Sequence, residues 1–412
     1  MDQAVDYRNI STQQIVIIGA SYAGISTAHY LLKHVIPQLP PKTRRIVLVS
    51  PSLETFCRPA CPRALIADSM FPQDKLFVNI PALFQQYSGD NFEFLHGEAV
   101  NLDHGNRKVT VKLAENSTQQ QLPYHTLVIA TGSSTVSPLL GYTKDSVFLR
   151  KKWQEFRDAL PLAKSIVIAG GGPAGVETAG ELGEYLNGRG FLKNGRSPSV
   201  AITLITSGKE LLPVLRPSIA KNAELLLGDV GVRVIKQTKV VSVSPRSAGI
   251  EEVATNARID LHDGTKLEAD IYIPAVGVTY NTKFIDNSLL TSDGRVETSS
   301  ATLRISNGGN STFAIGDVSS AARPAVHNVF AQVPVVCENI RRDLLNVEDG
   351  GDKTFIEDTR ETQLVPIGKS KAVGAAMGWS LPSFLVWLIK GRDYWLWTTD
   401  RLWSGRQWNK RS

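Results

Sequence analysis

The sequence has few cysteines, no long apolar run and little net charge, and each absence excludes a class of protein. Its three cysteines, Cys57, Cys61 and Cys337, are too few and odd in number for a secreted disulfide scaffold, and fit a reducing compartment. No apolar run reaches the roughly 18 residues of a membrane-spanning helix. The net charge of +6 is small for 412 residues, so we expect no nucleic-acid partner.

Sorting signals and metal sites are also missing. The chain starts MDQAVD, a polar segment without the charged-then-apolar pattern of a signal peptide, and Asp2 excludes N-myristoylation. No His and Cys residues stand at metal-ligand spacing, so we predict no metal. We therefore expect an intracellular protein, cytoplasmic or peripherally bound to a membrane.

Two similar units of strand, Gly-rich turn, helix and strand are present instead. In the first, the apolar run 14–18 leads into GASYAG at 19–24, and a second strand follows at 45–50. In the second, the run 165–169 leads into GGGPAG at 170–175, with the next strand at 200–206. This order is typical of dinucleotide-binding folds. The sequence thus predicts an α/β protein with two Rossmann-like domains.

The turns supply the first candidate site residues. The second turn matches G-x-G-x-x-G fully, whereas Ser21 replaces the middle glycine of the first. That glycine lets the backbone approach a pyrophosphate at a helix N-terminus, and a serine is small and can itself bond a phosphate. We predict cofactor binding by Gly19, Ser21, Tyr22, Ala23 and Gly24 in the first turn, and by Gly170, Gly172, Pro173, Ala174 and Gly175 in the second.

Neither unit has the acidic residue that usually ends the second strand and binds the adenosine ribose. Ser50 follows the first of these strands, and Ser207 and Lys209 follow the second. We include all three among the cofactor-binding candidates. Without a carboxylate there, and with Lys209 nearby, the second unit permits NADPH as well as NADH. Alternatively, Lys209 is a solvated loop lysine.

Three further strands end in small residues, at VIATG (128–132), IPAVG (273–277) and AIGD (314–317). Together with the two turns, they resemble the flavoproteins with two dinucleotide-binding domains. The resemblance implies FAD in the first domain, with Asp317 bonding the ribityl chain, and NADH or NADPH in an inserted second domain. The other candidate cofactor-binding residues are Arg58, Thr131, Gly132, Gly277 and Gly316.

This resemblance also gives a domain layout. Residues 12–140 and 271–345 form the two parts of the FAD-binding domain. Residues 141–270 form the NAD(P)-binding domain, and 346–412 a C-terminal domain with a basic, aromatic tail.

The segments GGGPAGVETAGEL and GWSLPSFLVWLIKGRDY narrow the family. They look like the apoptosis-inducing-factor-like flavoproteins, and most of all like the ferroptosis suppressor proteins and their fungal relatives. This implies hydride transfer from NAD(P)H to the flavin, and then electron transfer to a quinone or similar small acceptor. By the same resemblance, catalytic Glu177 faces the nicotinamide and pairs with a basic residue beside the flavin, for which Arg63 is the candidate. Stabilisation of the helix N-terminus alone would also explain Glu177.

Three alternative functions remain open at this point. Cys57 and Cys61 lie where related disulfide reductases carry a redox pair, although their spacing differs. The same fold also serves redox signalling with slow turnover and the tailoring of secondary metabolites, and fold alone does not choose. The physiological acceptor, the nucleotide preference and the oligomeric state stay open.

The tail, residues 379–412, contains six of the seven tryptophans and an excess of basic residues. Its apolar run, 381–389, is too short to cross a bilayer core of about 30 Å. Tryptophan and basic charge favour a peripheral position on a membrane. Alternatively, the run covers the active-site face or a partner subunit.

Overall fold

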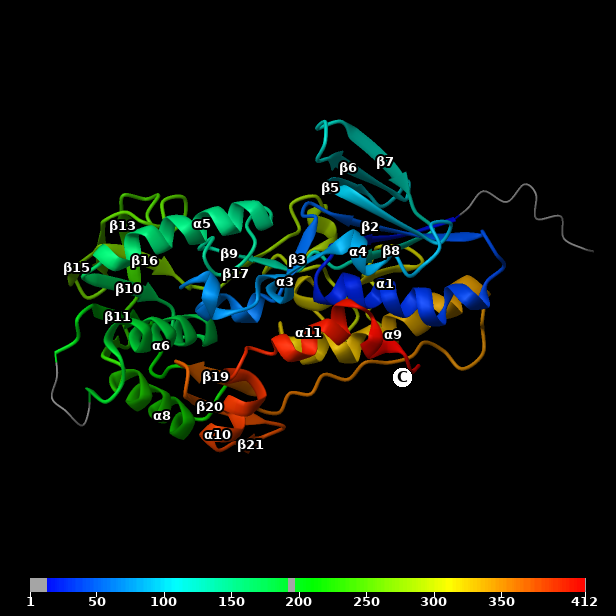
Figure 1. Ribbon diagram of the computed structural model, residues 1–412. Helices are drawn as coiled ribbons and strands as arrows, with labels where there is room; N and C mark the ends of the chain where they lie inside the picture. The colour runs from blue at the N-terminus through cyan, green and yellow to red at the C-terminus, as the bar shows by residue number, and fades with distance from the viewer. Residues whose placement is uncertain (1–12, 192–196, 412) are drawn as a thin grey trace, which may run out of the picture.

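The computed structural model describes residues 13–191 and 197–411, so the N-terminal segment, for which we expect no signal peptide, lies outside the described residues. Two α/β units lie side by side, and a smaller C-terminal part lies against both (Figure 1). This is the α/β fold with two Rossmann-type units that the sequence predicts.

The first unit is built on a seven-stranded sheet of order β18-β8-β1-β2-β5-β6-β7. Its first five members run parallel, namely β18 (Thr312–Ala314), β8 (Thr126–Ile129), β1 (Gln13–Ile18), β2 (Arg44–Ser50) and the start of β5 (Phe92–Asp103). The sheet then continues antiparallel through β6 (Lys108–Leu113) and β7 (Gln119–Pro123). Helices α1 (Tyr22–His34) and α9 (Val326–Leu345) pack together below it (Figure 1).

The second unit has a parallel four-stranded sheet of order β12-β11-β10-β16. These strands are β12 (Val232–Ile235), β11 (Ala201–Ile205), β10 (Ser165–Ala169) and β16 (Ile271–Pro274). The predicted domain boundary after residue 270 is therefore wrong, because β16 pairs with β10 and completes this sheet. The unit also contains α5 (Ser146–Ala159), α6 (Pro173–Asn187), α8 (Pro217–Gly228) and an antiparallel sheet of β13 (Val240–Ser244), β14 (Ala257–Leu261) and β15 (Lys266–Ala269).

The central strands of both units consist of apolar residues buried on both faces. Residues 15–18 of β1 and 166–169 of β10 are all buried, as are all of β8 and β16. Continuous apolar runs of this kind suit parallel strands covered on both faces by helices. This is why these runs could be recognised as strands from the sequence.

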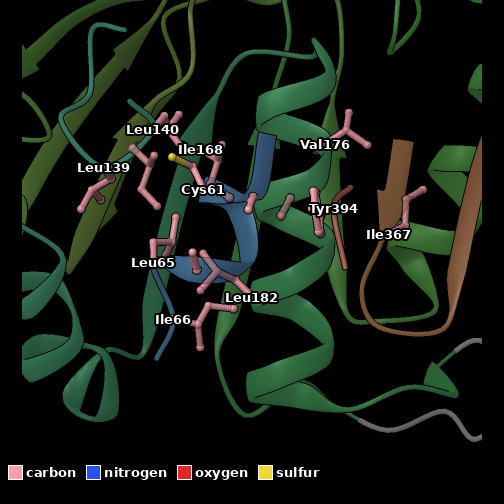
Figure 2. Close-up of a cluster of buried hydrophobic side chains, with 14 of the residues drawn as sticks. Cys61, Leu65, Ile66, Leu139, Leu140, Ile168, Val176, Leu182, Ile367 and Tyr394 are labelled. Carbon is pink, nitrogen blue, oxygen red and sulfur yellow. The ribbon is translucent and has the colours of Figure 1, made fainter. Parts of the chain in front are cut away.

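Short elements join the two units. Strand β9 (Ser133–Thr135) pairs antiparallel with β17 (Val278–Tyr280), and β3 (Glu54–Phe56) pairs with β4 (Phe77–Asn79). The short helices are α2 (Cys61–Ala64), α3 (Gln73–Leu76) and α4 (Ile80–Leu83). Figure 2 shows Cys61 and Leu65, near α2, and Leu182 on α6 gathered in one apolar cluster with Tyr394 from the C-terminal part. The core therefore continues from one unit to the next.

The C-terminal part bridges the two units. Its sheet contains β19 (Gln363–Ile367), β20 (Lys371–Ala376) and β21 (Trp379–Ser380), and lies against α6 and α8. After α10 (Ser383–Val386) and a π-helix (Trp387–Gly391), α11 (Leu396–Trp403) packs on α1. None of the helices in the described part of the chain is long and apolar enough to cross a bilayer.

The last turns of the chain belong to the core of the first unit. Nε2 of His29 lies 2.8 Å from the carbonyl oxygen of Trp403, and Nε2 of His34 lies 2.7 Å from that of Trp408. Both tryptophans are buried. Trp403 and Trp408 therefore cover the first unit, whereas the exposed Trp397 and the earlier part of the tail remain candidates for contact with a membrane.

Candidate active site

A cavity of about 1740 Å³ lies between the two units and is lined by both Gly-rich turns. Most of the candidate cofactor-binding residues line it: Gly19, Ser21, Tyr22, Ala23, Ser50, Arg58, Thr131, Gly132, Gly170, Gly172, Pro173, Ala174, Ser207, Gly277, Gly316 and Asp317. The fold brings these residues together because the carboxyl ends of the parallel strands of both sheets meet at the cavity.

The last glycine of each turn lies elsewhere. Gly24 and Gly175 do not line the cavity. A Cβ atom on Gly24 would lie 1.7 Å from the carbonyl oxygen of Gly19, and one on Gly175 would lie 1.9 Å from that of Gly170. These glycines therefore allow each helix to pack closely against its own turn. Lys209 also does not line the cavity, which favours the interpretation as a loop lysine.

The residues present fit two bound dinucleotides. Helices α1 and α6 both begin at the cavity wall, and neither Ser21 nor Gly172, their N-cap residues, makes a side-chain capping hydrogen bond. A Cβ atom added to Gly172 or Gly132 would meet no atom within 4 Å. Both helix N-termini therefore lie uncapped at the cavity wall, with free space beside Gly172, an arrangement that favours a phosphate group.

Asp317 stands where β18 ends, and two neighbours orient its carboxylate. The hydroxyl of Ser133 donates to Oδ2 of Asp317 at 2.7 Å, and Nη1 of Arg58 lies 3.7 Å from the same oxygen. Arg58 also donates to the carbonyl oxygen of Ser133 at 2.9 Å. The three side chains form a polar group at the wall of the cavity. Ser133, which sequence reasoning missed, follows Gly132 directly.

Glu177 lies on the first turns of α6 and lines the cavity, but its partner is Lys390. Nζ of Lys390 lies 2.5 Å from Oε1 of Glu177 and donates to the carbonyl oxygen of Leu364 at 3.0 Å. Both side chains are buried. Burial raises the pKa of Glu177 to about 7, against the opposing effect of Lys390. A carboxyl group with such a pKa exchanges protons near neutral pH.

The predicted pairing of Glu177 with Arg63 is wrong. Arg63 does not line the cavity; its Nε and Nη2 donate to the two carboxylate oxygens of Glu181, at 2.9 and 2.7 Å. It also bonds the carbonyl oxygens of Arg392 and Gly368. Four hydrogen bonds from one guanidinium to three parts of the fold indicate a structural role.

Lys390 and Trp395 are two further cavity residues that the sequence analysis did not identify. Lys390 belongs to the π-helix, a rare element that often occurs at functional sites. Tyr394 and Trp395 have φ angles of 52° and 69°, a left-handed conformation that is rare for aromatic residues. Of these two, Trp395 lines the cavity, and a strained residue at a cavity wall is a common sign of a functional site.

The cysteines are free thiols in this structure. Cys57 and Cys61 are fully buried, and burial raises the pKa of Cys57 to about 11 and raises that of Cys61 further. Because the thiolate is the reactive form, neither side chain is activated for thiol chemistry. Among residues 13–191 and 197–411, no cluster of three or more His, Cys, Asp or Glu side chains could hold a metal ion.

Comparison with known proteins gives a consistent picture. The family model for pyridine nucleotide-disulphide oxidoreductases matches residues 13–335. The chain is 59% identical to oxidoreductase phnG of Penicillium herquei, over 98% of each chain. It is 32% identical to oxidoreductase ptaL of Pestalotiopsis fici, over 92% of this chain and 95% of that one. Ferroptosis suppressor protein 1 of Homo sapiens is 25% identical, over 94% and 95%.

Solved structures share the fold at low sequence identity. Sulfide:quinone oxidoreductase from Aquifex aeolicus has a TM-score of 0.72 and 16% identity, over 97% of this chain and 92% of that one. NDH2 from Plasmodium falciparum, solved in complex with NADH, has a TM-score of 0.67 and 16% identity, over 97% and 100%.

Proposed function

The chain belongs to the pyridine nucleotide-disulphide oxidoreductase family and is an FAD-dependent oxidoreductase that uses NAD(P)H; from this premise we propose that it reduces a quinone or a similar small acceptor that reaches the flavin directly. The observation that carries this proposal is the state of Cys57 and Cys61. They are buried, unpaired and hard to ionise. Without a dithiol relay, the acceptor itself must enter the cavity.

The flavin, when bound, supplies the two-electron chemistry, and the protein supplies position and protons. The turns that begin α1 and α6 would hold the two pyrophosphates. Asp317, oriented by the hydroxyl of Ser133, would accept a hydrogen bond from the ribityl chain. Reduction of a quinone to a quinol consumes protons, and Oε1 of Glu177 and Nζ of Lys390 hold one between them at the cavity wall.

The test uses the purified, flavin-loaded protein with NADH and with NADPH, against a panel of short-chain quinones. We expect rapid quinone reduction, equally fast in the Cys57→Ala/Cys61→Ala variant. If the double variant keeps its flavin but loses turnover, the direct route is wrong. Slow turnover with every acceptor would indicate a redox-signalling role instead.

A second candidate is an oxidoreductase that tailors a secondary metabolite. The same fold serves this reaction too, and the chain is more similar to the oxidoreductases phnG and ptaL than to ferroptosis suppressor protein 1. Comparison of kcat/KM between simple quinones and larger aromatic carbonyl compounds separates the two candidates. A preference for the larger compounds by tenfold or more, about 1.4 kcal/mol in transition-state binding, would favour tailoring.

A further inference from the structure

The early part of the C-terminal tail exposes large apolar side chains. We call five of them the apolar surface. They come, in chain order, from the turn before β21, from β21, α10, the π-helix and α11: Met377, Trp379, Phe384, Leu388 and Trp397. Trp379 is 77% exposed and Phe384 is 69% exposed. Among the residues that the structure describes, four aromatic side chains are at least 50% exposed, and three of them, Trp379, Phe384 and Trp397, lie here. Single exposed apolar residues are ordinary, but a group of aromatic ones marks an interaction site.

These side chains lie on neighbouring elements. Helix α10 is fixed to β20 by a hydrogen bond from the backbone N–H of Ala372 to the hydroxyl of Ser383, at 2.9 Å. Phe384 and Leu388 are four residues apart and so lie on one face of the helix. The indole of Trp397 donates to the carbonyl oxygen of Ile389 at 3.5 Å, next to Leu388. In Figure 1, α10 and β21 lie at the outer edge of the C-terminal part.

Cations outnumber carboxylates among the exposed charges around the apolar surface, where the exposed carboxylate Asp400, three residues after Trp397 on α11, pairs with Arg406. Between residues 362 and 399, the exposed charged side chains are Lys369, Lys371 and Arg392, all of them cations. The one carboxylate in that stretch, Asp393, is half-buried and lies 3.4 Å from Arg392. Exposed tryptophan and phenylalanine surrounded by cations match the interface of an anionic bilayer, with aromatic rings at the headgroup level and Lys or Arg against the lipid charge.

A second copy of the chain fits this surface less well. In a two-fold dimer, the same patch meets itself, so the three cations of one copy would face those of the other. Like charges brought together at an interface are unfavourable. The charge pattern therefore favours lipid over a partner subunit.

The apolar surface also adjoins the cavity. Lys390 and Trp395 line the cavity, whereas Leu388 and Trp397, each two residues away, are exposed. The two faces of one short stretch thus form the cavity wall and the apolar surface.

We propose that the apolar surface docks the enzyme on an anionic lipid bilayer, so that the adjoining cavity receives its acceptor from the lipid phase. The second half of this statement rests on the proposed function, whereas the docking itself does not. Docking is peripheral, because in the described part of the chain no helix can span the bilayer.

Vesicle flotation tests the docking with the full-length, flavin-loaded protein. We expect binding at low salt to vesicles of phosphatidylcholine and phosphatidylserine, and weaker binding to phosphatidylcholine alone. Trp379→Ser/Phe384→Ser should lower binding tenfold or more. Lys369→Gln/Lys371→Gln should lower it roughly 30-fold, since each cation near such a surface contributes about fivefold. All four side chains are exposed, so the variants should fold.

Matched controls change exposed residues elsewhere. Leu162→Ser/Ile356→Ser removes equally exposed apolar side chains, and Lys112→Gln/Lys266→Gln removes two exposed cations. Neither control should change binding. Full-length protein that ignores anionic vesicles at low salt would overturn the proposal. A dimer that Trp379→Ser/Phe384→Ser dissociates, without vesicle binding, would assign the surface to a second copy.

An activity measurement tests the supply of acceptor separately. Trp379→Ser/Phe384→Ser should leave turnover of a water-soluble short-chain quinone unchanged and slow turnover of a long-chain quinone embedded in the same anionic vesicles. Equal rates with the embedded quinone would overturn the lipid-phase route. Failure of the proposed function looks different, because no quinone would then be reduced while vesicle binding persisted.

Discussion

Helix α6 carries two buried ion pairs that lie one turn apart and differ in their surroundings. Glu177 pairs with Lys390 at the wall of the cavity, and Glu181 pairs with Arg63 away from it. Tyr394, one turn after Lys390, donates its hydroxyl to Oε1 of Glu181 at 3.0 Å. The Lys390 pair therefore joins α6 to the C-terminal segment directly, whereas the Arg63 pair joins α6 to α2 and is linked to that segment by Tyr394.

The difference between the pairs lies in how fully each charge is satisfied. Both oxygens of Glu181 accept hydrogen bonds from Arg63, and the guanidinium is also stacked against Tyr394 at 4.9 Å. Glu177 has one strong partner, and its burial raises its pKa toward neutrality. A saturated pair stabilises a junction, whereas a less saturated pair beside a cavity can exchange a proton. We infer a structural role for the Arg63 pair and a role in the chemistry for the Lys390 pair.

The largest effect should come from breaking the structural pair. Arg63→Met leaves the carboxylate of Glu181 buried without its cation, which should lower the free energy of unfolding by about 3–5 kcal/mol. Denaturant unfolding measures this, and Arg63→Met/Glu181→Leu should recover much of the loss. If Arg63→Met slowed flavin reduction in a protein of unchanged stability, the two roles would be reversed.

The next effect concerns pH. Glu177 has a folded-state pKa of about 7, above its ordinary value of 4.5, so between these values the folded state binds more protons than the unfolded state. Stability should therefore fall as pH rises through this window, by about 3 kcal/mol in all from this group. Glu177→Gln should remove that decline, as seen in urea unfolding at about pH 5 and about pH 8. An unchanged pH profile in the variant would contradict the raised pKa.

Kinetics should show a smaller change with the same variant. We expect Glu177→Gln to slow flavin reduction by NAD(P)H about tenfold, equal to about 1.4 kcal/mol, and to slow reoxidation by a quinone less. Stopped-flow measurement separates these half-reactions. Glu184→Gln, on the same helix but outside the cavity, is the control. If Glu177→Gln reduced its flavin as fast as the wild type, Glu177 would serve only to stabilise the helix N-terminus.

The smallest effect should come from the tyrosine that links the two pairs. Tyr394→Phe removes one hydrogen bond to Glu181 but leaves Arg63 in place, so we expect a loss of about 1 kcal/mol in stability. Calorimetry measures this, with flavin reduction as the second readout. A loss as large as that in Arg63→Met would show that the tyrosine, and not the ion pair, maintains the junction.

Local patterns explain why much of the site could be predicted. The strands before Gly19 and Gly170 are continuous apolar runs, and each leads directly into its turn. Strand, turn and helix are consecutive in the chain, so their geometry depends on near neighbours. For the same reason Asp317, at the end of its own strand, could be recognised from the residues beside it.

Other features could not be predicted, because they depend on residues far apart in the sequence. Lys390 is 213 residues from Glu177, and nothing near Lys390 in the chain indicates its partner. Arg63 was the candidate partner of Glu177 by resemblance alone. Its guanidinium bonds Glu181 instead because α2 packs on α6. The domain boundary failed for a similar reason, since β16 becomes part of the second sheet only by pairing with β10.

The sequence by itself therefore determined the fold class, the two dinucleotide-binding turns and the position of Glu177 at the start of a helix, because these are encoded in short, periodic segments. The tertiary structure alone decided which cation neutralises which carboxylate, which tryptophans are buried and which remain exposed. Those choices depend on how the C-terminal segment packs across both units, and the free energy of that packing is a property of the assembled core, not of any local pattern.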